Sequence, residues 1–318
     1  MRFRIATDGR WSGGGKVVLR NLRFAESEHP DVLDPEGSIP LIPRNLVPRA
    51  LLITGRFVYL PQNAAPWHAV GGTPREWARW RYLRTMSDIA ALRTMGTVRI
   101  SSSIPARRSD GQVLANVLDE DFETALDGAA EQREDLADAF VCVGSMWSYR
   151  NLPTLLRAFA GYRRRGGRLR LVIAGSPDVD KVYRTVKEAA SGMDAVSVAA
   201  SAPARPEVLR MFRSAHASIF PSLVETTSVM VLEGIATSPR LLISDIVGHR
   251  EVAGSRVSEE AFFDPLDPSA LTASLHAAEE AGPSSMESDI STPDGRARAR
   301  AAWASALAGH LRRLGERA

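Results

Sequence analysis

Two glutamates eight residues apart, Glu225 and Glu233, bracket a stretch that could bind an anion. Residues 220–236 read FPSLVETTSVMVLEGIA, and the polar run Thr226 to Ser228 suits the start of a helix. The free N–H groups and the dipole at a helix start favour a bound anion such as a diphosphate. Because carboxylates accept hydrogen bonds from paired hydroxyls, we expect Glu225 to contact a sugar and Glu233 the ribose of a nucleotide.

The same stretch resembles the signature of a known family. The run PSLVE at 221–225, followed by seven residues and Glu233, is similar to the motif of the retaining GT-B glycosyltransferases of family four. Residues 244–252 and 263–268 resemble two further family segments. The resemblance implies two Rossmann-like doubly wound α/β domains facing across a cleft. It also implies transfer of a sugar from a nucleotide diphosphate-sugar to a hydroxyl, with retention and without a metal or cofactor.

A loop upstream carries the donor-side part of this resemblance. Residues 143–152, VGSMWSYRNL, are similar to the strand-loop-helix opening of the family's donor domain. Ser145 stands where the family often has Arg, and Arg150 where it has Lys; Arg can bind phosphate as a fork. Two more positions depart from the family: residues 226–228 replace Gly-Phe-Gly, and Ser201 replaces a common glycine.

The resemblance then implies a role for each donor-side residue. Arg150 and the amides of about Thr227 to Val229 would stabilise the leaving diphosphate, while Glu225 orients the sugar. The donor is expected to be linked to UDP or GDP. The full set of donor-binding residues that this predicts is Gly14, Gly15, Ser145, Arg150, Ser201, Glu225, Thr226, Thr227, Ser228, Val229 and Glu233.

The N-terminal half supplies two weaker candidates. The run Gly13-Gly14-Gly15-Lys16 follows an expected strand, and its backbone N–H groups could approach a diphosphate or sugar closely. It lacks the spacing of a P-loop. Residues 58–67 resemble a family segment on the acceptor side. We therefore expect Asn63, Trp67 and His68 to face the acceptor, with Asn63 or His68 in place of the family's histidine and Asn63 counted as catalytic.

The elements that must position these residues alternate along the chain. Apolar runs predict strands, and the longer patterns at 75–95 and 152–165 predict helices. Alternation of this kind indicates parallel sheets, whose ligands lie at the carboxyl ends of the strands. The predicted strands are 3–6, 57–60, 97–101, 139–143, 169–174, 195–198, 217–220 and 240–244.

We predict three parts: an acceptor-binding domain at 1–137, a donor-binding domain at 138–292 and a C-terminal segment at 293–318 that packs back across the domains. Residues 26–48 are rich in Pro, Asp and Glu and are expected to form a loop. A final helix at about 295–314 would place Trp303, Leu307 and Leu311 on one face.

Composition narrows the class of protein. The 318 residues are 44% hydrophobic and 24% charged, with a net charge of +3, as in a globular protein. The basic residues are spread out, which argues against nucleic acid as a partner, and their skew to arginine suggests a GC-rich bacterial genome. Cys142 is expected to be a buried small hydrophobe. Without an apolar run of about 18 residues we expect a cytoplasmic protein without a membrane span, for which peripheral membrane contact stays open.

Several alternatives remain at this point. The chain could be a GT-B sugar-nucleotide epimerase or hydrolase, a non-catalytic relative serving as scaffold, or a nucleic-acid-binding protein. No pair of histidines has the spacing of metal ligands, so no metal is expected. The acceptor could be a natural product or an envelope saccharide, and the protein a monomer or a homodimer.

Overall fold

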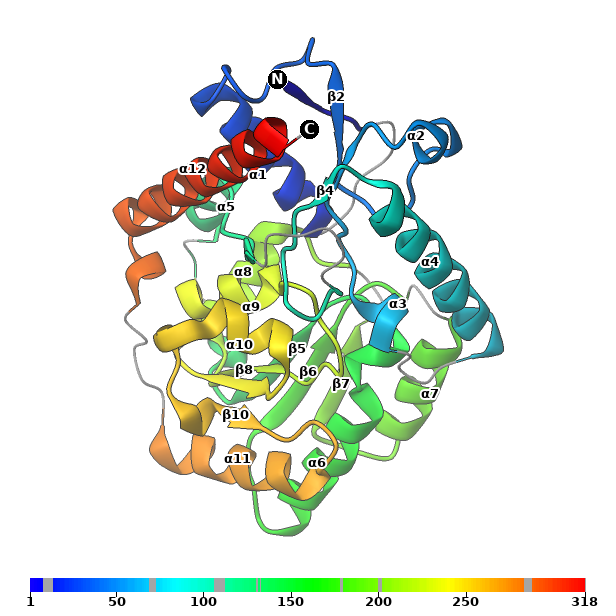
Figure 1. Ribbon diagram of the computed structural model, residues 1–318. Helices are drawn as coiled ribbons and strands as arrows, with labels where there is room; N and C mark the ends of the chain where they lie inside the picture. Colours follow the sequence, from blue (N-terminus) through cyan, green and yellow to red (C-terminus); the bar gives the residue numbers. More distant parts are fainter. Residues whose placement is uncertain are drawn as a thin grey trace. The chain divides into compact units, whose positions relative to one another are not determined.

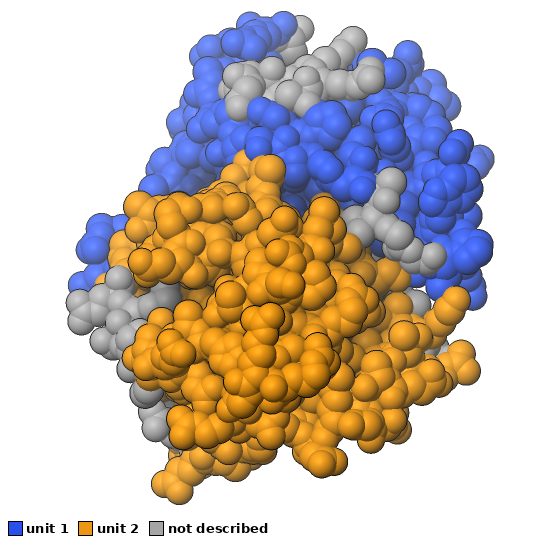
Figure 2. Space-filling view, turned by 90° about the horizontal axis from the view of Figure 1, so that it is seen from below, with its two compact units in different colours: residues 1–120, 225–229, 294–318 blue, residues 121–224, 230–293 orange. Residues whose placement is uncertain are grey.

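A computed structural model describes most of the chain as two compact units, coloured in Figure 2. The described residues are 1–7, 14–68, 73–105, 112–129, 131, 133–177, 180–199, 202–282 and 288–317. Unit 1 comprises Met1–Glu120, Glu225–Val229 and Asp294–Ala318, and unit 2 comprises Asp121–Val224 and Met230–Pro293. The predicted domain limits at 137 and 292 remain predictions, but helix α5 (Asp121–Asp127) packs against α8 (Arg205–Ser214) and belongs to unit 2.

Unit 1 is built on a four-stranded parallel sheet in the order β1-β2-β3-β4 (Figure 1). All residues of the second to fourth strands are buried, and the first strand buries Phe3 and Ile5. The strands are β1 (Phe3–Ile5), β2 (Ile39–Ile42), β3 (Val58–Tyr59) and β4 (Gly96–Thr97), and the helices are α1 (Gly14–Glu28), α2 (Arg49–Thr54), α3 (Ala65–His68), α4 (Pro74–Arg93) and α12 (Pro293–Arg317).

The C-terminal helix α12 packs on this sheet. The predicted helix at 295–314 is confirmed, and Trp303, Leu307 and Leu311 are buried as expected. A Cβ atom on Gly96 would lie 2.4 Å from a methyl carbon of Leu314, so glycine at this position leaves room for the Leu314 side chain against β4.

The prediction of a loop at 26–48 is wrong. The segment contains the end of α1 and all of β2, a strand whose four residues are buried. Prolines around and within IPLI suggested a loop, since proline breaks strand ladders. Pairing of β2 with β3 begins only at Leu41, so the missing N–H of Pro40 costs no ladder bond on that side.

Unit 2 has a six-stranded parallel sheet in the order β10-β9-β8-β5-β6-β7, which confirms the predicted doubly wound fold. This is the order 3-2-1-4-5-6 of a Rossmann sheet, and the direction of winding reverses between β5 and β8. The strands are β5 (Ala139–Val143), β6 (Arg170–Ala174), β7 (Val196–Ala199), β8 (Ala217–Phe220), β9 (Leu241–Ser244) and β10 (Phe262–Phe263), and the remaining helices are α6 (Leu152–Arg164), α7 (Asp180–Ala190), α9 (Val229–Thr237), α10 (Val247–Ala253) and α11 (Pro268–Ala281).

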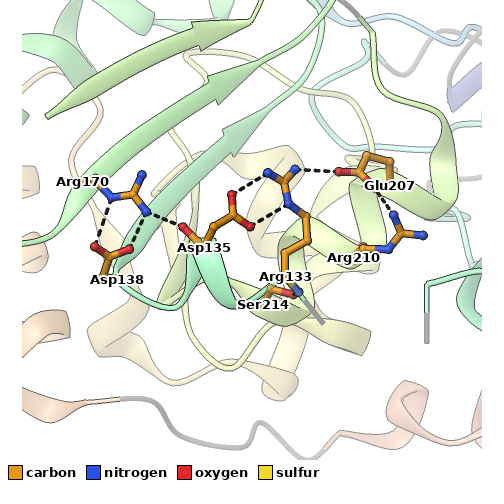
Figure 3. Close-up of polar contacts among 7 residues, drawn as sticks. All are labelled: Arg133, Asp135, Asp138, Arg170, Glu207, Arg210 and Ser214. Atoms are coloured by element: carbon orange, nitrogen blue, oxygen red, sulfur yellow. Dashed lines mark hydrogen bonds and ion pairs between the residues drawn. The ribbon is translucent and has the colours of Figure 1, made fainter. Parts of the chain in front are cut away.

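A group of ion pairs lies near the amino ends of β5 and β6 (Figure 3). Arg133 donates to Asp135 at 2.7 Å and to Glu207 of α8 at 2.8 Å. Arg170, the first residue of β6, donates to Asp138 at 2.6 Å. Exposed pairs of this kind contribute little each. They lie at the end of the sheet away from the carboxyl ends of the strands, where ligands bind in such folds.

No helix in the described part of the chain is long and apolar enough to cross a bilayer.

Candidate functional site

The loop after β5 is fixed against the loop after β6. Gly144 donates its N–H to the carbonyl of Ala174 at 2.9 Å, and Met146 donates to the carbonyl of Ser176 at 2.8 Å. A Cβ atom on Gly175 would lie 1.8 Å from the carbonyl oxygen of Gly144, so residue 175 must be glycine. The backbone that carries Ser145 and Arg150 is therefore set by packing against its neighbour.

This loop is also joined to the loop after β8, across the point where the winding reverses. Leu223 donates its N–H to the carbonyl of Tyr149 at 2.8 Å, and Arg150 Nη1 lies 3.4 Å from Ser222 Oγ. Ser244 at the end of β9 donates to the carbonyl of Ser222 at 2.6 Å. Open α/β sheets bind their ligands at this kind of reversal point. The structure thus places the predicted cation, Arg150, where a ligand is expected.

Aromatic rings support Arg150. Its guanidinium carbon lies 5.6 Å from the ring centre of Tyr149, which stacks on Trp147 at 6.4 Å with 12° between the ring planes. Cys142 in β5 is 6% exposed, which confirms it as a buried core residue. Burial raises the pKa of the Cys142 thiol to about 12, and the charge of Arg150 acts in the opposite direction. The thiol is therefore a neutral packing group beside a cationic one.

Glu233 is buried with an arginine that the sequence analysis missed. It lies one turn into α9 and is 3% exposed. Arg205, the first residue of α8, donates from Nε to Glu233 Oε1 at 2.7 Å, and its guanidinium lies 5.6 Å from the ring centre of Phe122. An ionised carboxylate has about four acceptor positions, and this bond directs one of the two oxygens of Glu233 toward α8.

The turn that follows Glu225 belongs to unit 1 and is hydrogen-bonded to two other segments of that unit. Thr226 Oγ1 accepts a hydrogen bond from the N–H of Ala64 at 2.8 Å, and Thr227 Oγ1 donates to the carbonyl of Ile100 at 2.7 Å. Both threonines are buried, whereas Glu225 is partly exposed. Since the hydroxyls are engaged with backbone, any contribution of these residues to donor binding falls to their N–H groups.

The three predicted acceptor-side residues lie at one helix. Asn63 Oδ1 accepts from the N–H of Ala65 at 2.8 Å and so begins α3. Trp67 Nε1 donates to Asp88 of α4 at 3.1 Å. The exposed His68 has Nε2 2.8 Å from the carbonyl oxygen of Ser103.

A further residue, Asn45, positions Asn63 and was missed from the sequence. Its Oδ1 accepts from the N–H groups of Gln62 at 3.2 Å and Asn63 at 2.9 Å, and its Nδ2 donates to the carbonyl of Asn63 at 3.0 Å. Tyr59 donates its hydroxyl to the carbonyl of Asn45 at 3.2 Å. Burial raises the pKa of the Tyr59 hydroxyl, so it stays a neutral donor. A lone asparagine in a loop gave no signal for this role.

The structure describes fewer contacts for the remaining predicted residues. Gly14 and Gly15 begin α1, while Gly13 and Ser201 lie outside the described residues. Ser145 accepts the N–H of Trp147 through its carbonyl at 3.0 Å. Within the described ranges, no three His, Cys, Asp or Glu side chains are grouped so that they could hold a metal ion.

Comparisons with known proteins bear on both units. Residues 137–279 match the family described as glycosyl transferases group 1. A comparison with curated proteins gave no match.

Three synthases among the solved structures of similar fold match 95–97% of the chain at 11–12% identity. The α,α-trehalose 6-phosphate synthase of Burkholderia multivorans has a TM-score of 0.60 and 12% identity, over 97% of this chain and 78% of its own. A trehalose-6-phosphate synthase studied with bisubstrate glycomimetics for glycosyl transfer with retention has a TM-score of 0.60 and 12% identity, over 96% and 80%. The UDP-forming synthase of Burkholderia xenovorans in complex with glucose-6-phosphate has a TM-score of 0.55 and 11% identity, over 95% and 75%.

Proposed function

We propose that this chain, a GT-B glycosyltransferase whose residues 137–279 form a glycosyl transferases group 1 domain, transfers a sugar from a nucleotide diphosphate-sugar to a hydroxyl of a saccharide or small-molecule acceptor. One observation carries the proposal. The loops after β5 and β8 flank the reversal point of a Rossmann sheet, and Arg150 Nη1 and Ser222 Oγ, 3.4 Å apart, link them. A cation fixed at this position suits a diphosphate.

The proposed reaction breaks the bond between the anomeric carbon of the sugar and the terminal phosphate oxygen of the donor. Negative charge then grows on the leaving diphosphate. Arg150 and the N–H groups at the start of α9 would stabilise that charge, which is the largest single contribution in many enzymes. Charge stabilisation by these groups needs no metal ion.

Two carboxylates would orient the donor. Glu225 accepts hydrogen bonds from the sugar hydroxyls, and Glu233 accepts them from the ribose. Arg205 acts as a positioning residue, because its bond of 2.7 Å fixes the Glu233 carboxylate. Vicinal hydroxyls present paired donors, which a correctly directed carboxylate can accept together.

We propose that the anomeric configuration is retained. The acceptor oxygen attacks from the side on which the diphosphate leaves, and the acceptor proton passes to the leaving phosphate. This route requires no strongly basic side chain. The solved structure studied for transfer with retention supports it by fold similarity.

Acceptor binding is assigned to Asn63, Trp67 and His68. The indole Nε1 of Trp67 is fixed by Asp88, and Asn63 is fixed by Asn45. Since a relative of the same fold holds glucose-6-phosphate, we would test that compound first as acceptor, with UDP-glucose as donor.

The test combines binding with turnover. A nucleoside diphosphate at 100 times its dissociation constant adds about 2.7 kcal/mol of stability, so thermal unfolding with UDP, GDP, ADP and TDP identifies the base. Release of the same nucleotide from its sugar conjugate, with a panel of acceptors, then measures transfer. Glu233→Gln, which should weaken nucleotide binding about tenfold, should reduce the stabilisation to about half, whereas Glu260→Gln, at an exposed glutamate, should leave it unchanged. If no nucleotide stabilises the protein and none is released, the proposal fails.

A further inference from the structure

Unit 2 contains a cavity of about 630 Å³ beside helix α6. Helix α6 contacts both α11 and α7, and the walls come from these three helices and the turns that adjoin them (Figure 1). The described lining residues fall within 153–165, 189–193 and 268–272, and none belongs to the loops after β5 and β8. This space, called here the α6 cavity, is therefore separate from the candidate donor site, and its volume lies within the range of pockets that bind small molecules.

The wall that α11 forms is fixed against α6. Thr272 Oγ1 lies 2.9 Å from the carbonyl oxygen of Ala158, and a Cβ atom on Gly161 would lie 2.9 Å from the same hydroxyl oxygen. Before the two helices begin, Asn151 donates from Nδ2 to the carbonyl of Pro265 at 2.8 Å. The helices are thus joined at their starts and along their contact, so the α6 cavity is already formed without a ligand.

One face of α6 places open space between two cations. Four lining residues are spaced by three, four and seven positions along the helix and therefore share this face: Arg157, Ala160, Gly161 and Arg164. The two small residues leave room above the helix. The two arginines stand at the ends of that room, about 10 Å apart along the helix axis.

The end of α6 supplies arginines that the protein itself does not use. Arg163 donates to the carbonyl of Gly167 at 2.7 Å and so satisfies the helix end. Arg164 and Arg165 follow it and line the α6 cavity. Their side chains are exposed and make no hydrogen bond or ion pair with any residue that the structure describes. Each guanidinium therefore keeps its five N–H donors for a ligand.

No Asp or Glu occurs among the described residues that line the α6 cavity. Arg157 donates to the hydroxyl of Thr154 at 2.8 Å, a neutral partner that leaves the positive charge in place. Asp267 precedes a lining residue in the sequence, but its carboxylate accepts the N–H of Ser269 at 2.7 Å and caps α11. The α6 cavity thus combines positive charge with an apolar interior.

We propose that the α6 cavity binds a small organic anion that carries a phosphate or carboxylate group on an apolar body. Arginine binds both groups through paired N–H donors. The apolar lining, to which Leu156, Met193 and Pro268 contribute, suits the body of such a ligand. A second copy of this chain is a poorer occupant, because a symmetric contact would bring two sets of arginines together. The inference does not depend on the proposed glycosyl transfer.

Fluorescence titration with anilinonaphthalene sulfonate tests the proposal. This probe carries one anionic group on an aromatic body and becomes fluorescent in apolar surroundings. The full-length protein is titrated with and without an excess of UDP and GDP, at low and at high salt. We expect saturable binding that the nucleotides do not displace and that weakens as the salt concentration rises.

A pair of arginine variants tests the charge. Arg157→Gln with Arg164→Gln should weaken probe binding at least about tenfold, since each change removes a charged hydrogen-bond donor from the cavity. Arg49→Gln with Arg298→Gln removes the same charge from exposed positions of unit 1 and should change the affinity little. Circular dichroism confirms that each variant is folded.

A cavity-filling variant tests the space. Ala160→Phe places a ring between the two arginines and should also weaken the probe at least about tenfold, because the apolar body loses its room. Ala277→Phe, at an exposed alanine of α11 outside the cavity, is the matched control and should leave the affinity unchanged.

Four results would overturn the inference. The first is a wild-type protein without saturable probe binding, and the second is displacement of the probe by the nucleotides, which would place it in the donor site. The third is an equal loss from the two arginine pairs, or equal effects of the two phenylalanine changes, which would mean unspecific binding. The fourth is a wild-type dimer that Ala160→Phe converts to monomer, which would make the cavity a contact between copies.

Discussion

Breaking the buried pair of Arg205 and Glu233 should have unequal and non-additive effects. Glu233 has a side chain only 4% exposed, whereas that of Arg205 is 22% exposed. Arg205→Gln leaves a buried carboxylate without its cation, which costs about 3 kcal/mol. Glu233→Gln leaves the more exposed arginine, which water can reach, and should cost about 1 kcal/mol.

The expected coupling follows from the geometry. With about 4 Å between the charge centres and an effective dielectric constant of about 20, attraction amounts to about 4 kcal/mol. Desolvation of Glu233 offsets part of this, which leaves a coupling energy of about 2 kcal/mol. The double variant should therefore lose about 2 kcal/mol rather than the sum of about 4 kcal/mol.

Urea unfolding of the wild type, the two single variants and the double variant measures the coupling energy. Calorimetric titration with the preferred nucleoside diphosphate measures how the pair contributes to nucleotide binding. Glu233→Gln should weaken nucleotide binding about tenfold, and Arg205→Gln by a smaller factor. Neither change should affect a 2′,3′-dideoxy analogue, which lacks the ribose hydroxyls. Additive stabilities, or an equal loss for the dideoxy analogue, would refute this reasoning.

Four further predictions concern other parts of the chain. Arg150→Ala should weaken the binding of a nucleoside diphosphate by about 1.5–3 kcal/mol in calorimetric titration, while the binding of the unphosphorylated nucleoside stays unchanged. Equal losses for the two ligands would contradict the role of Arg150 in diphosphate binding. Gly175→Ala should cost at least about 3 kcal/mol in urea unfolding because its Cβ would meet a backbone oxygen at 1.8 Å, whereas Gly192→Ala, with open space around it, should be tolerated. Thr226→Val should cost about 1–3 kcal/mol because it leaves a buried N–H unpaired, and Thr226→Ser should restore most of this loss; no rescue by Ser would mean that the hydroxyl is unimportant. A hydrogen bond from Arg170 holds the pKa of Asp138 below its ordinary value of 3.8, so the stability that this bond adds at higher pH should be lost as pH falls below about 4. Asp138→Asn should therefore reduce the pH dependence of the unfolding free energy, measured with urea, by tenths of a kcal/mol.

The core of unit 2 could be predicted from the sequence because buried parallel strands are continuous apolar runs. The run at 139–143 became β5 with the same limits, and 217–220 became β8. The reversal between these two strands follows from their order in the sheet. The sequence alone thus predicted that Arg150 follows the carboxyl end of a buried strand, whereas the reversal at that end depends on the strand order, which only the structure shows.

Other elements gave weaker local signals. Strand β10 has two residues, Phe262 and Phe263, which is too short for a period to show. Strand β4 covers only Gly96 and Thr97, although the apolar pattern predicted a strand at 97–101. The chain after β4 leaves the sheet although Val98 and Ile100 are buried apolar residues, so tertiary packing decides where pairing ends.

The partners within the candidate site were the least predictable part. Arg205 lies 28 residues before Glu233, and no local pattern links them. Likewise, the threonines at 226 and 227 suggested a helix start, while their hydroxyls bond to the backbone of Ala64 and Ile100. Such pairs depend on how distant segments pack, which one sequence does not show.

Hydrogen exchange measured by mass spectrometry, with and without the nucleoside diphosphate that stabilises the protein most, tests the central claim directly. The account predicts slower exchange in the two loops at the reversal point, in peptides covering residues 144–152 and 220–233, and no such change in Arg150→Ala at the same nucleotide concentration. Protection confined to other segments, or undiminished protection in Arg150→Ala, would contradict it.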